Sequence, residues 1–197
     1  MHGGDVFADE EAFLRYLRTT ELRDPFWSPD ALARWRETLA RRFADRCDII
    51  MPTMPNKYNA RYEEWMIWFE RHIPLLSDGA VLVGHSLGGI FLAKYLAEND
   101  FPVRIALLAL VSAPYDTDSP GQILGDFALP DDLSTIADRT DRILLYHSKD
   151  DPVVPFEEMG KYTRAIPGSV AIPLDGRGHI LDEDFPELSA VIESILG

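Results

Sequence analysis

Short apolar runs alternate along the chain with longer amphipathic runs. The sequences of these runs are not repeated, and no Gly/Ser-rich linker divides the chain. Short runs that are apolar throughout are typical of strands buried on both faces, and apolar spacings of three and four are typical of helices. Their alternation predicts a doubly wound α/β domain, with a mostly parallel sheet and helices on both faces. In such sheets, functional residues gather in the loops at the carboxyl ends of the strands.

The apolar runs predict strands at 47–51, 80–83, 104–112, 142–146 and 169–174. The amphipathic runs predict helices at 10–17, 29–43, 61–76, 87–98, 156–165 and 185–196. Ser28 and Pro29 suit the N-cap and the first turn of the second helix. Trp65, Trp68 and Phe69 are expected in the core and in a pocket wall, and Cys47 is expected to be buried in the first strand. At 197 residues, the chain is expected to form a single domain over 1–197.

Charge and composition exclude several classes of partner. Thirty-three acidic and 19 basic side chains give a formal charge of -14, which repels phosphate backbones and anionic lipids. Neither nucleic acid nor a membrane is therefore expected as a partner. The longest strongly apolar run, 105–111, is far shorter than the roughly 20 residues of a membrane span. A single cysteine and no secretory signal at residues 1–5 favour a cytoplasmic protein, and no partner protein is indicated.

Residues 84–89, Gly-His-Ser-Leu-Gly-Gly, follow the predicted strand 80–83 and include the start of the predicted helix at Leu87. A serine on a sharp strand-to-helix turn needs neighbours without side chains, and Gly84 and Gly88 lie two residues away on either side. The turn exposes Ser86 Oγ and aims the Leu87 amide and the positive end of the helix at the same point. The motif therefore predicts a nucleophile elbow at Ser86, and an ordinary strand–helix turn is the alternative.

A nucleophilic serine needs a base, and the base needs a carboxylate that orients it. The elbow motif predicts the chain order Ser, then Asp or Glu, then His. His179, in a glycine-flanked loop after the last predicted strand, is the expected base. Asp151 is the expected carboxylate, because Pro152 biases it toward extended backbone and the adjacent Asp150 points to the other side. Asp150 is expected to be a solvated turn carboxylate or a helix cap.

The other histidines are not expected to act as the catalytic base. His85 is merely the variable residue of the elbow motif, His72 packs in a helix, and His2 lies too close to glycine turns to act as a base. His147 either lines the site or is a buried strand residue, and the second reading is favoured. No nucleotide-binding glycine motif, Cys–His cluster or H-E-x-x-H motif is present, so no cofactor and no metal is expected.

A tetrahedral oxyanion needs a second backbone donor besides the Leu87 amide. Residues 2–5, His-Gly-Gly-Asp, suit this role, because glycines let a carbonyl oxygen approach the main chain closely. Gly3 and Gly4 are therefore the candidate oxyanion residues, and an unstructured terminus is the alternative.

Together these motifs resemble the α/β-hydrolase superfamily, and more narrowly the small lidless serine hydrolases of the retinoblastoma-binding-protein type. The likeness covers nearly the whole chain and implies a catalytic triad of Ser86, Asp151 and His179, with oxyanion amides from Leu87 and from Gly3 or Gly4. We expect hydrolysis of small carboxylic esters through an acyl-enzyme, with a small-molecule acyl substrate. A thioesterase, amidase or acyltransferase on the same triad, and a binding module without turnover, are the alternatives.

Two segments stand apart from this pattern. In the family, an apolar strand precedes the His-Gly-Gly loop, whereas only Met1 does here. We therefore expect a missing first strand, inside the sheet and next to the strand of Ile49 and Ile50. Residues 114–138, rich in Asp, Pro, Ser and Gly, are either a short rim insertion over the acyl pocket or a plain surface excursion. At roughly 24 residues they are too short for an independent lid domain.

Overall fold

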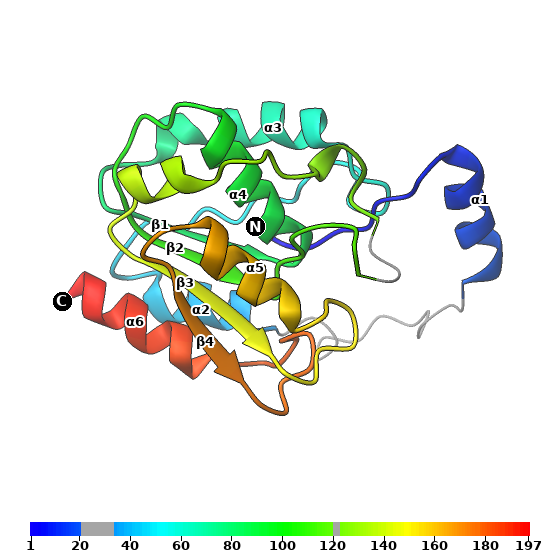
Figure 1. The fold of residues 1–197 in the computed structure, drawn as a ribbon. Coiled ribbons are helices and arrows are strands. Elements are labelled where there is room, and N and C mark those ends of the chain that lie inside the picture. The colour runs from blue at the N-terminus through cyan, green and yellow to red at the C-terminus, as the bar shows by residue number, and fades with distance from the viewer. Residues whose placement is uncertain (21–33, 120–122) are drawn as a thin grey trace. The chain divides into compact units, whose positions relative to one another are not determined.

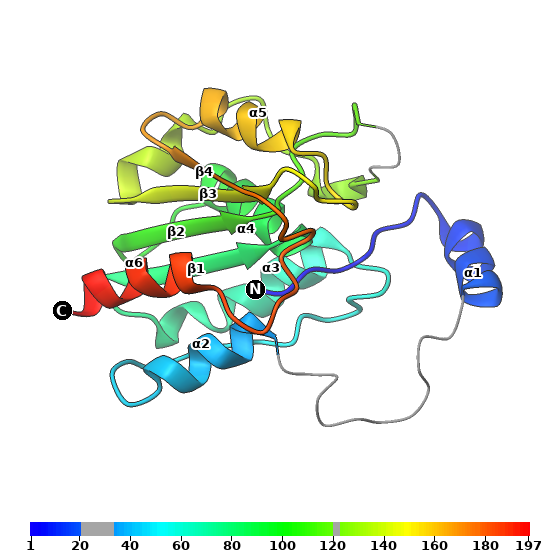
Figure 2. The same cartoon turned by 90° about the horizontal axis from the view of Figure 1, so that it is seen from below.

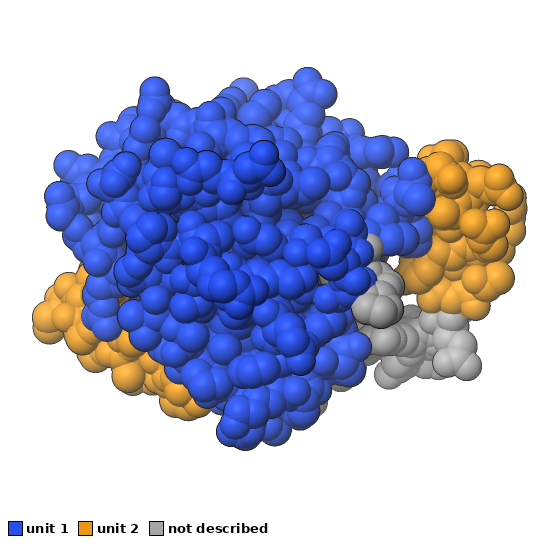
Figure 3. All heavy atoms as spheres, in the orientation of Figure 1, with its two compact units in different colours: residues 1–8, 51–180 blue, residues 9–50, 181–197 orange. Residues whose placement is uncertain are grey.

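The structure, a computed structural model, describes residues 1–20, 34–119 and 123–197 (Figures 1 and 2). It contains two compact units: unit 1 comprises residues 1–8 and 51–180, and unit 2 comprises residues 9–50 and 181–197 (Figure 3). Ser28 and Pro29, the predicted start of a helix, lie outside the described residues. A single domain over 1–197 stays a prediction.

Unit 1 is built on a parallel four-stranded sheet whose strands lie side by side in chain order (Figure 2). The strands are β1 (Ala80–His85), β2 (Ile105–Val111), β3 (Ile143–Ser148) and β4 (Val170–Leu174). Helix α4 (Leu87–Glu98) connects β1 to β2 and packs on both, and α5 (Glu157–Ala165) does the same for β3 and β4. Strand β3 is buried at every position, as expected for a strand covered on both faces. The predicted α/β fold class is confirmed.

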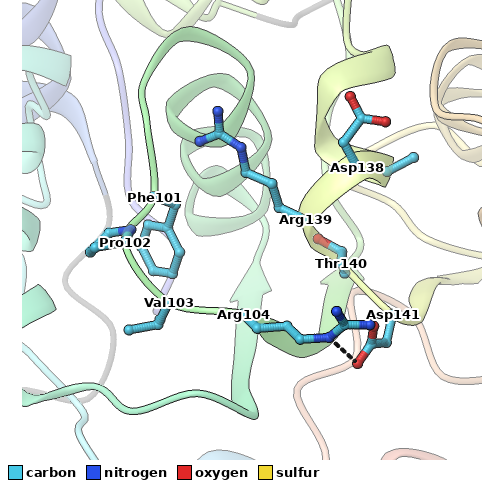
Figure 4. Close-up of a pocket in the computed structure, with 9 residues that line it drawn as sticks. Phe101, Pro102, Val103, Arg104, Asp138, Arg139, Thr140 and Asp141 are labelled. Carbon is cyan, nitrogen blue, oxygen red and sulfur yellow. Dashed lines mark hydrogen bonds and ion pairs between the residues drawn. The ribbon is translucent and has the colours of Figure 1, made fainter.

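The parallel arrangement gathers the loops after all four strands at one edge of the sheet, where Ser86, the segment after Val111, Asp151 and His179 follow their strands. At the opposite edge, residues 101–104 and 137–141 line a hollow of about 440 Å³ (Figure 4). Two of the lining residues, Arg104 and Asp141, form an ion pair (Figure 4). The hollow lies at the amino ends of β2 and β3, so it is separate from the edge that carries Ser86.

An aromatic cluster fills the core beneath α3 (Tyr62–Glu70), which is followed by the short 3-10 helix η2 (Ile73–Leu75). Trp65 is fully buried, and its ring packs edge-on against those of Phe91 and Phe127. Phe69 is also buried, so the core prediction is confirmed for these two residues. It is wrong for Trp68, whose surface is 39% exposed, because Trp68 lies on the outer side of the helix.

Part of the segment 114–138 belongs to this core. Its described residues include the 3-10 helices η3 (Gly125–Phe127) and η4 (Ser134–Arg139). Ile123 is exposed, whereas four other apolar residues of the segment are buried in the same cluster: Leu124, Phe127, Leu133 and Ile136. The Asp126 carboxylate also accepts a hydrogen bond from the Tyr62 amide at the start of α3. The segment is therefore anchored by core packing, and a rim over the substrate stays a prediction.

The predicted strand at 47–51 is wrong. Residues 47–50 form neither strand nor helix, and Cys47 is exposed rather than buried. The expected missing strand therefore has no neighbouring strand at Ile49 and Ile50. A run of five residues before a proline, four of them apolar and one an aspartate, fits a strand and an extended coil equally well, so periodicity could not separate them. Met1 extends the ladder of β1 instead: its nitrogen donates to the Val83 carbonyl at 2.6 Å, and its carbonyl accepts from the His85 amide at 3.1 Å.

Unit 2 contains α1 (Glu10–Thr19), α2 (Trp35–Phe43) and α6 (Pro186–Leu196). The start of α2 is tied to the segment before α6, because the Trp35 amide donates to the Asp182 carbonyl at 2.8 Å and the rings of Trp35 and Phe185 pack edge-on. Helix α1 has no buried residue. Within the described residues, no helix has the length and apolarity needed to cross a membrane.

Candidate active site

Ser86 occupies a strained turn between β1 and α4. Its backbone angles, φ 55° and ψ -125°, lie in a region that residues other than glycine rarely adopt. Hydrogen bonds hold this conformation: the Ser86 amide donates to the Val111 carbonyl at 2.8 Å, and the Ser86 carbonyl accepts from the Gly89 amide at 2.8 Å. The strand–turn–helix context predicted for Ser86 is present in the structure.

The glycines of the motif are required by close packing around this turn. A Cβ at Gly84 would overlap the Gly88 carbonyl. A Cβ at Gly88 would lie 2.5 Å from the His2 carbonyl oxygen, and one at Gly89 would lie 2.6 Å from the Ala113 Cβ. Larger residues at these positions would therefore move the turn or the segment that carries His2.

Gly3 lies against Ser86. A Cβ at Gly3 would be 3.0 Å from the Ser86 Cβ and 3.4 Å from Ser86 Oγ. Gly4 faces another neighbour, since a Cβ there would be 2.7 Å from the Lys57 carbonyl oxygen and 3.3 Å from the Leu87 side chain. Leu87 is the first residue of α4, so its amide is one of those at the helix end that lack an intrahelical partner. The structure thus brings Gly3 into contact with Ser86, and Leu87 follows Ser86 directly in the chain.

His2 holds the segment that contains Gly3. The Met54 amide donates to His2 Nε2 at 2.8 Å, so Nε2 is the unprotonated nitrogen and Nδ1 donates to the Gly3 carbonyl at 2.6 Å. Beyond the glycines, the Asp5 amide donates to the Lys57 carbonyl at 2.8 Å. These contacts exclude the alternative of an unstructured terminus at residues 2–5.

Asp151 and His179 meet at the ends of β3 and β4. His179 Nδ1 lies 3.0 Å from Asp151 Oδ1 and 2.9 Å from Oδ2, and the Asp151 side chain is fully buried. Asp151 Oδ1 also accepts from the amides of Val153 and Val154, at 2.9 and 3.0 Å. Burial alone would raise the pKa of Asp151, but the hydrogen bonds from His179 and these amides outweigh it and hold that pKa below its usual value. The carboxylate is therefore charged at neutral pH and oriented by several donors.

Asp150 lies exposed in the turn after β3, which confirms the predicted solvated turn carboxylate, and it has a further task there. Its Oδ1 accepts from Ser148 Oγ and from the Gly178 amide, and the Arg177 amide donates to Ser148 Oγ at 3.0 Å. Helix α5 has no side-chain cap, so Asp150 does not cap it. Ser148 and Asp150 together fasten the loop that carries His179.

His147 is a buried strand residue, as favoured from the sequence. It is 1% exposed, and its Nε2 donates to the Val154 carbonyl at 2.9 Å while lying 3.5 Å from Asp151 Oδ2. Burial lowers the pKa of His147, which keeps it neutral beside the carboxylate. His147 therefore supports the turn that presents Asp151.

His85 is more than the variable residue of the elbow. His85 is 3% exposed, its Nε2 lies 2.8 Å from the His179 carbonyl oxygen, and the two imidazole rings are 4.8 Å apart.

Among the described residues, no hydrogen bond joins Ser86 Oγ to His179 Nε2, and such contacts often tighten only in the substrate complex. Sequence reasoning missed the contacts of His85 and Asp150 with the loop of His179, because His179 and Gly178 lie 94 and 28 positions away from them in the chain.

The loop after β2 is held by a buried carboxylate. Glu158, in α5, is fully buried and accepts from the Tyr115 amide at 2.7 Å, Ser119 Oγ at 2.8 Å and Lys161 Nζ at 2.8 Å. This cluster fixes residues 115–119 next to the carboxyl end of β2. In the part of the chain that the structure describes, no group of three His, Cys, Asp or Glu side chains could hold a metal ion.

A parallel α/β sheet, a serine on a strained strand–helix turn and a paired Asp and His after later strands define the α/β hydrolases. Residues 25–194 match the family model described as serine hydrolase, so the chain belongs to that family and is a serine hydrolase. It is 26% identical to the serine hydrolase RBBP9 of Rattus norvegicus over 143 residues, 73% of this chain and 75% of the relative. It is 27% identical to YdeN of Bacillus subtilis over 162 residues, 81% of this chain and 85% of the relative.

The fold is similar to that of solved structures as well. The crystal structure of the ydeN gene product from B. subtilis has a TM-score of 0.74, with 24% identity, covering 82% of this chain and 90% of that chain. The resemblance to hydrolases of the retinoblastoma-binding-protein type that the motifs indicated is thereby confirmed.

Proposed function

We propose that the protein hydrolyses small carboxylic esters through an acyl-enzyme, with Ser86 as nucleophile, His179 as base and Asp151 as the carboxylate that orients the base. The observation that carries the proposal is the pairing of His179 Nδ1 with the buried Asp151, at the same sheet edge as the strained turn of Ser86. A carboxylate on Nδ1 leaves the proton-accepting lone pair on Nε2, the nitrogen that a serine proton must reach.

In the proposed mechanism, His179 Nε2 removes the Ser86 proton as Oγ attacks the acyl carbon. The Leu87 amide and a glycine amide stabilise the oxyanion, and Gly3 suits this role better than Gly4, because Gly3 lies against Ser86. Asp151 stabilises the positive charge of the imidazolium that forms, and the imidazolium then protonates the leaving alcohol. His179 next activates a water that releases the acid and restores Ser86. The proposed substrate is a small-molecule acyl compound, with no cofactor or metal in the reaction.

The test is labelling with a fluorophosphonate probe, read by intact mass and peptide mapping. One adduct on Ser86, absent from Ser86→Ala, is expected. His179→Ala should lower ester turnover by several orders of magnitude, on the scale of about 10⁶ for comparable triads. His72→Ala is the matched control: His72 lies in the turn after α3, outside the helix expected for it, and its Nδ1 bonds locally to the Trp68 carbonyl at 2.7 Å. Retained hydrolysis in Ser86→Ala would reject the mechanism.

A panel of acyl donors assigns the reaction. Matched oxygen esters, thioesters and amides of one acyl group are expected to be cleaved with the oxygen ester fastest. Faster cleavage of the thioester or the amide would replace the ester assignment on the same triad, and a folded protein without adduct or turnover would indicate a binding module.

We further propose a cytoplasmic location, supported by the single cysteine, and the charge of -14 disfavours nucleic acid and anionic membranes as partners.

A further inference from the structure

The loop that carries His179 needs support along its main chain. Gly176, Gly178 and Ile180 all have positive φ values, of 69°, 48° and 49°. For the β-branched Ile180, such a conformation is an outlier that the surrounding structure must hold. The contact between Asp151 and His179 fixes only one nitrogen of the imidazole, Nδ1, so the position of the ring also depends on where the main chain of His179 lies.

His85 supplies that support next to the nucleophile. Its Nε2 lies 2.8 Å from the His179 carbonyl oxygen, and because a carbonyl can only accept, Nε2 carries the proton. The His85 ring also packs at 4.8 Å from the His179 ring, and its side chain is shielded from water. His85 is covalently joined to Ser86, so this one hydrogen bond links the nucleophile's turn to the main chain of the base.

The other end of the loop has its own anchor. Ser148 Oγ and Asp150 bond to the amides of Arg177 and Gly178, two residues and one residue before His179. These bonds fix the approach of the loop but do not connect it to β1. The bond from His85 does so, and it joins residues 94 positions apart in the chain.

We propose that His85 is a positioning residue that holds the general base in register with the nucleophile. It touches neither substrate nor reacting atoms and acts through the His179 carbonyl. The proposal rests on the proposed function, since the base and nucleophile are those of the triad. A displacement of about 1 Å at a reacting pair can cost about 100-fold in rate. Because Asp151, Ser148 and Asp150 still hold His179, we expect a loss of about 10- to 100-fold in kcat when the His85 bond is removed.

Two amide side chains of different reach test this idea. In His85→Gln, the side-chain nitrogen occupies the place of Nε2 and can still donate to the carbonyl. In His85→Asn, the same amide group ends about where Nδ1 lies and falls short. With 4-nitrophenyl acetate as substrate, His85→Asn is expected to lower kcat by about 10- to 100-fold with little change in KM, and His85→Gln to recover to within about threefold of wild type. His72→Ala serves as the control for loss of a histidine.

A second readout does not depend on turnover. The proton on His179 Nδ1, bonded to a carboxylate, gives a low-field ¹H NMR resonance that weakens when the ring is mobile. This resonance is expected to persist in His85→Gln and to weaken or shift in His85→Asn. Melting curves of all variants set an assay temperature at which each is folded.

The outcomes separate the two proposals. Equal kcat values in His85→Asn and His85→Gln, whether both normal or both impaired, would overturn the positioning role, as would an unchanged His179 resonance in both. If the wild-type protein cleaves no acyl donor, the proposed function fails, and the resonance alone then decides whether His85 holds His179.

Discussion

Replacing Asp151 with asparagine exchanges a hydrogen-bond acceptor for a donor at the point where the carboxylate meets His179. Asp151 Oδ1 accepts from the amides of Val153 and Val154, and His179 Nδ1 lies 2.9 Å from Oδ2. The asparagine oxygen is expected to keep the two amide bonds, so its NH₂ group faces His179 Nδ1. A donor there selects the imidazole tautomer that carries its proton on Nε2, and this tautomer cannot accept the proton of Ser86.

The expected magnitude follows from this reversal. The wrong tautomer in a Ser-His-Asp triad lowers kcat by about 10⁴, which corresponds to about 5.4 kcal/mol of activation free energy. The loss of stability should be much smaller, because the two amide bonds remain and one bond is exchanged. We expect the free energy of unfolding to fall by about 1–3 kcal/mol.

Asp150→Asn is the matched control, because it makes the same chemical change in the adjacent residue. Asp150 Oδ1 accepts from Ser148 Oγ and the Gly178 amide, and an asparagine oxygen can keep both bonds. Its kcat should therefore stay within about tenfold of wild type, a change of at most about 1.4 kcal/mol. The assay is 4-nitrophenyl acetate hydrolysis with kcat and KM determined separately, on samples shown to be folded by thermal melts. A larger loss in Asp150→Asn than in Asp151→Asn would refute the reasoning.

Two further substitutions probe the packing around the site. Glu158→Gln is expected to lower the free energy of unfolding by about 1–3 kcal/mol in urea titrations, since the buried carboxylate accepts from the Tyr115 amide and pairs with Lys161. Burial would raise the pKa of Glu158, but its hydrogen bonds outweigh this and hold that pKa below its usual value. The stability that ionised Glu158 contributes is thus complete above its unfolded pKa of about 4.3 and is lost as pH falls through its pKa in the folded protein. Wild type should therefore lose more stability in acid than Glu158→Gln, and equal losses would contradict this role of Glu158. Gly88→Ala would put a methyl group 2.5 Å from the His2 carbonyl oxygen, so it should destabilise the protein by about 1–3 kcal/mol and slow hydrolysis, whereas an unchanged melting temperature would disprove this contact.

Residues whose role depends on their own backbone could be assigned from the sequence. Helix α4 begins and ends at Leu87 and Glu98 as predicted, because glycines around Ser86 mark the sharp turn before it. The choice of Asp151 over Asp150 as the partner of His179 also rested on local backbone preference, and the structure brings Asp151 and His179 into contact. The apolar runs at β2 and β3 predicted buried strands, since only a covered sheet accepts such runs.

The tertiary structure decided what depends on partners distant in the chain. The run at 47–51 has the pattern of a strand, but a short apolar run becomes a strand only where the folded sheet has an unpaired neighbour for it. In the structure, Met1 rather than this run bonds to the main chain of β1. Trp68 sits in an apolar stretch but faces outward. The sequence by itself determined the α/β class, the turn of Ser86 and the order of the candidate triad, because glycine, proline and apolar periodicity act locally. Only the folded chain decided that His85 donates to the carbonyl of His179, because that bond exists only after β1 and the loop following β4 have come together.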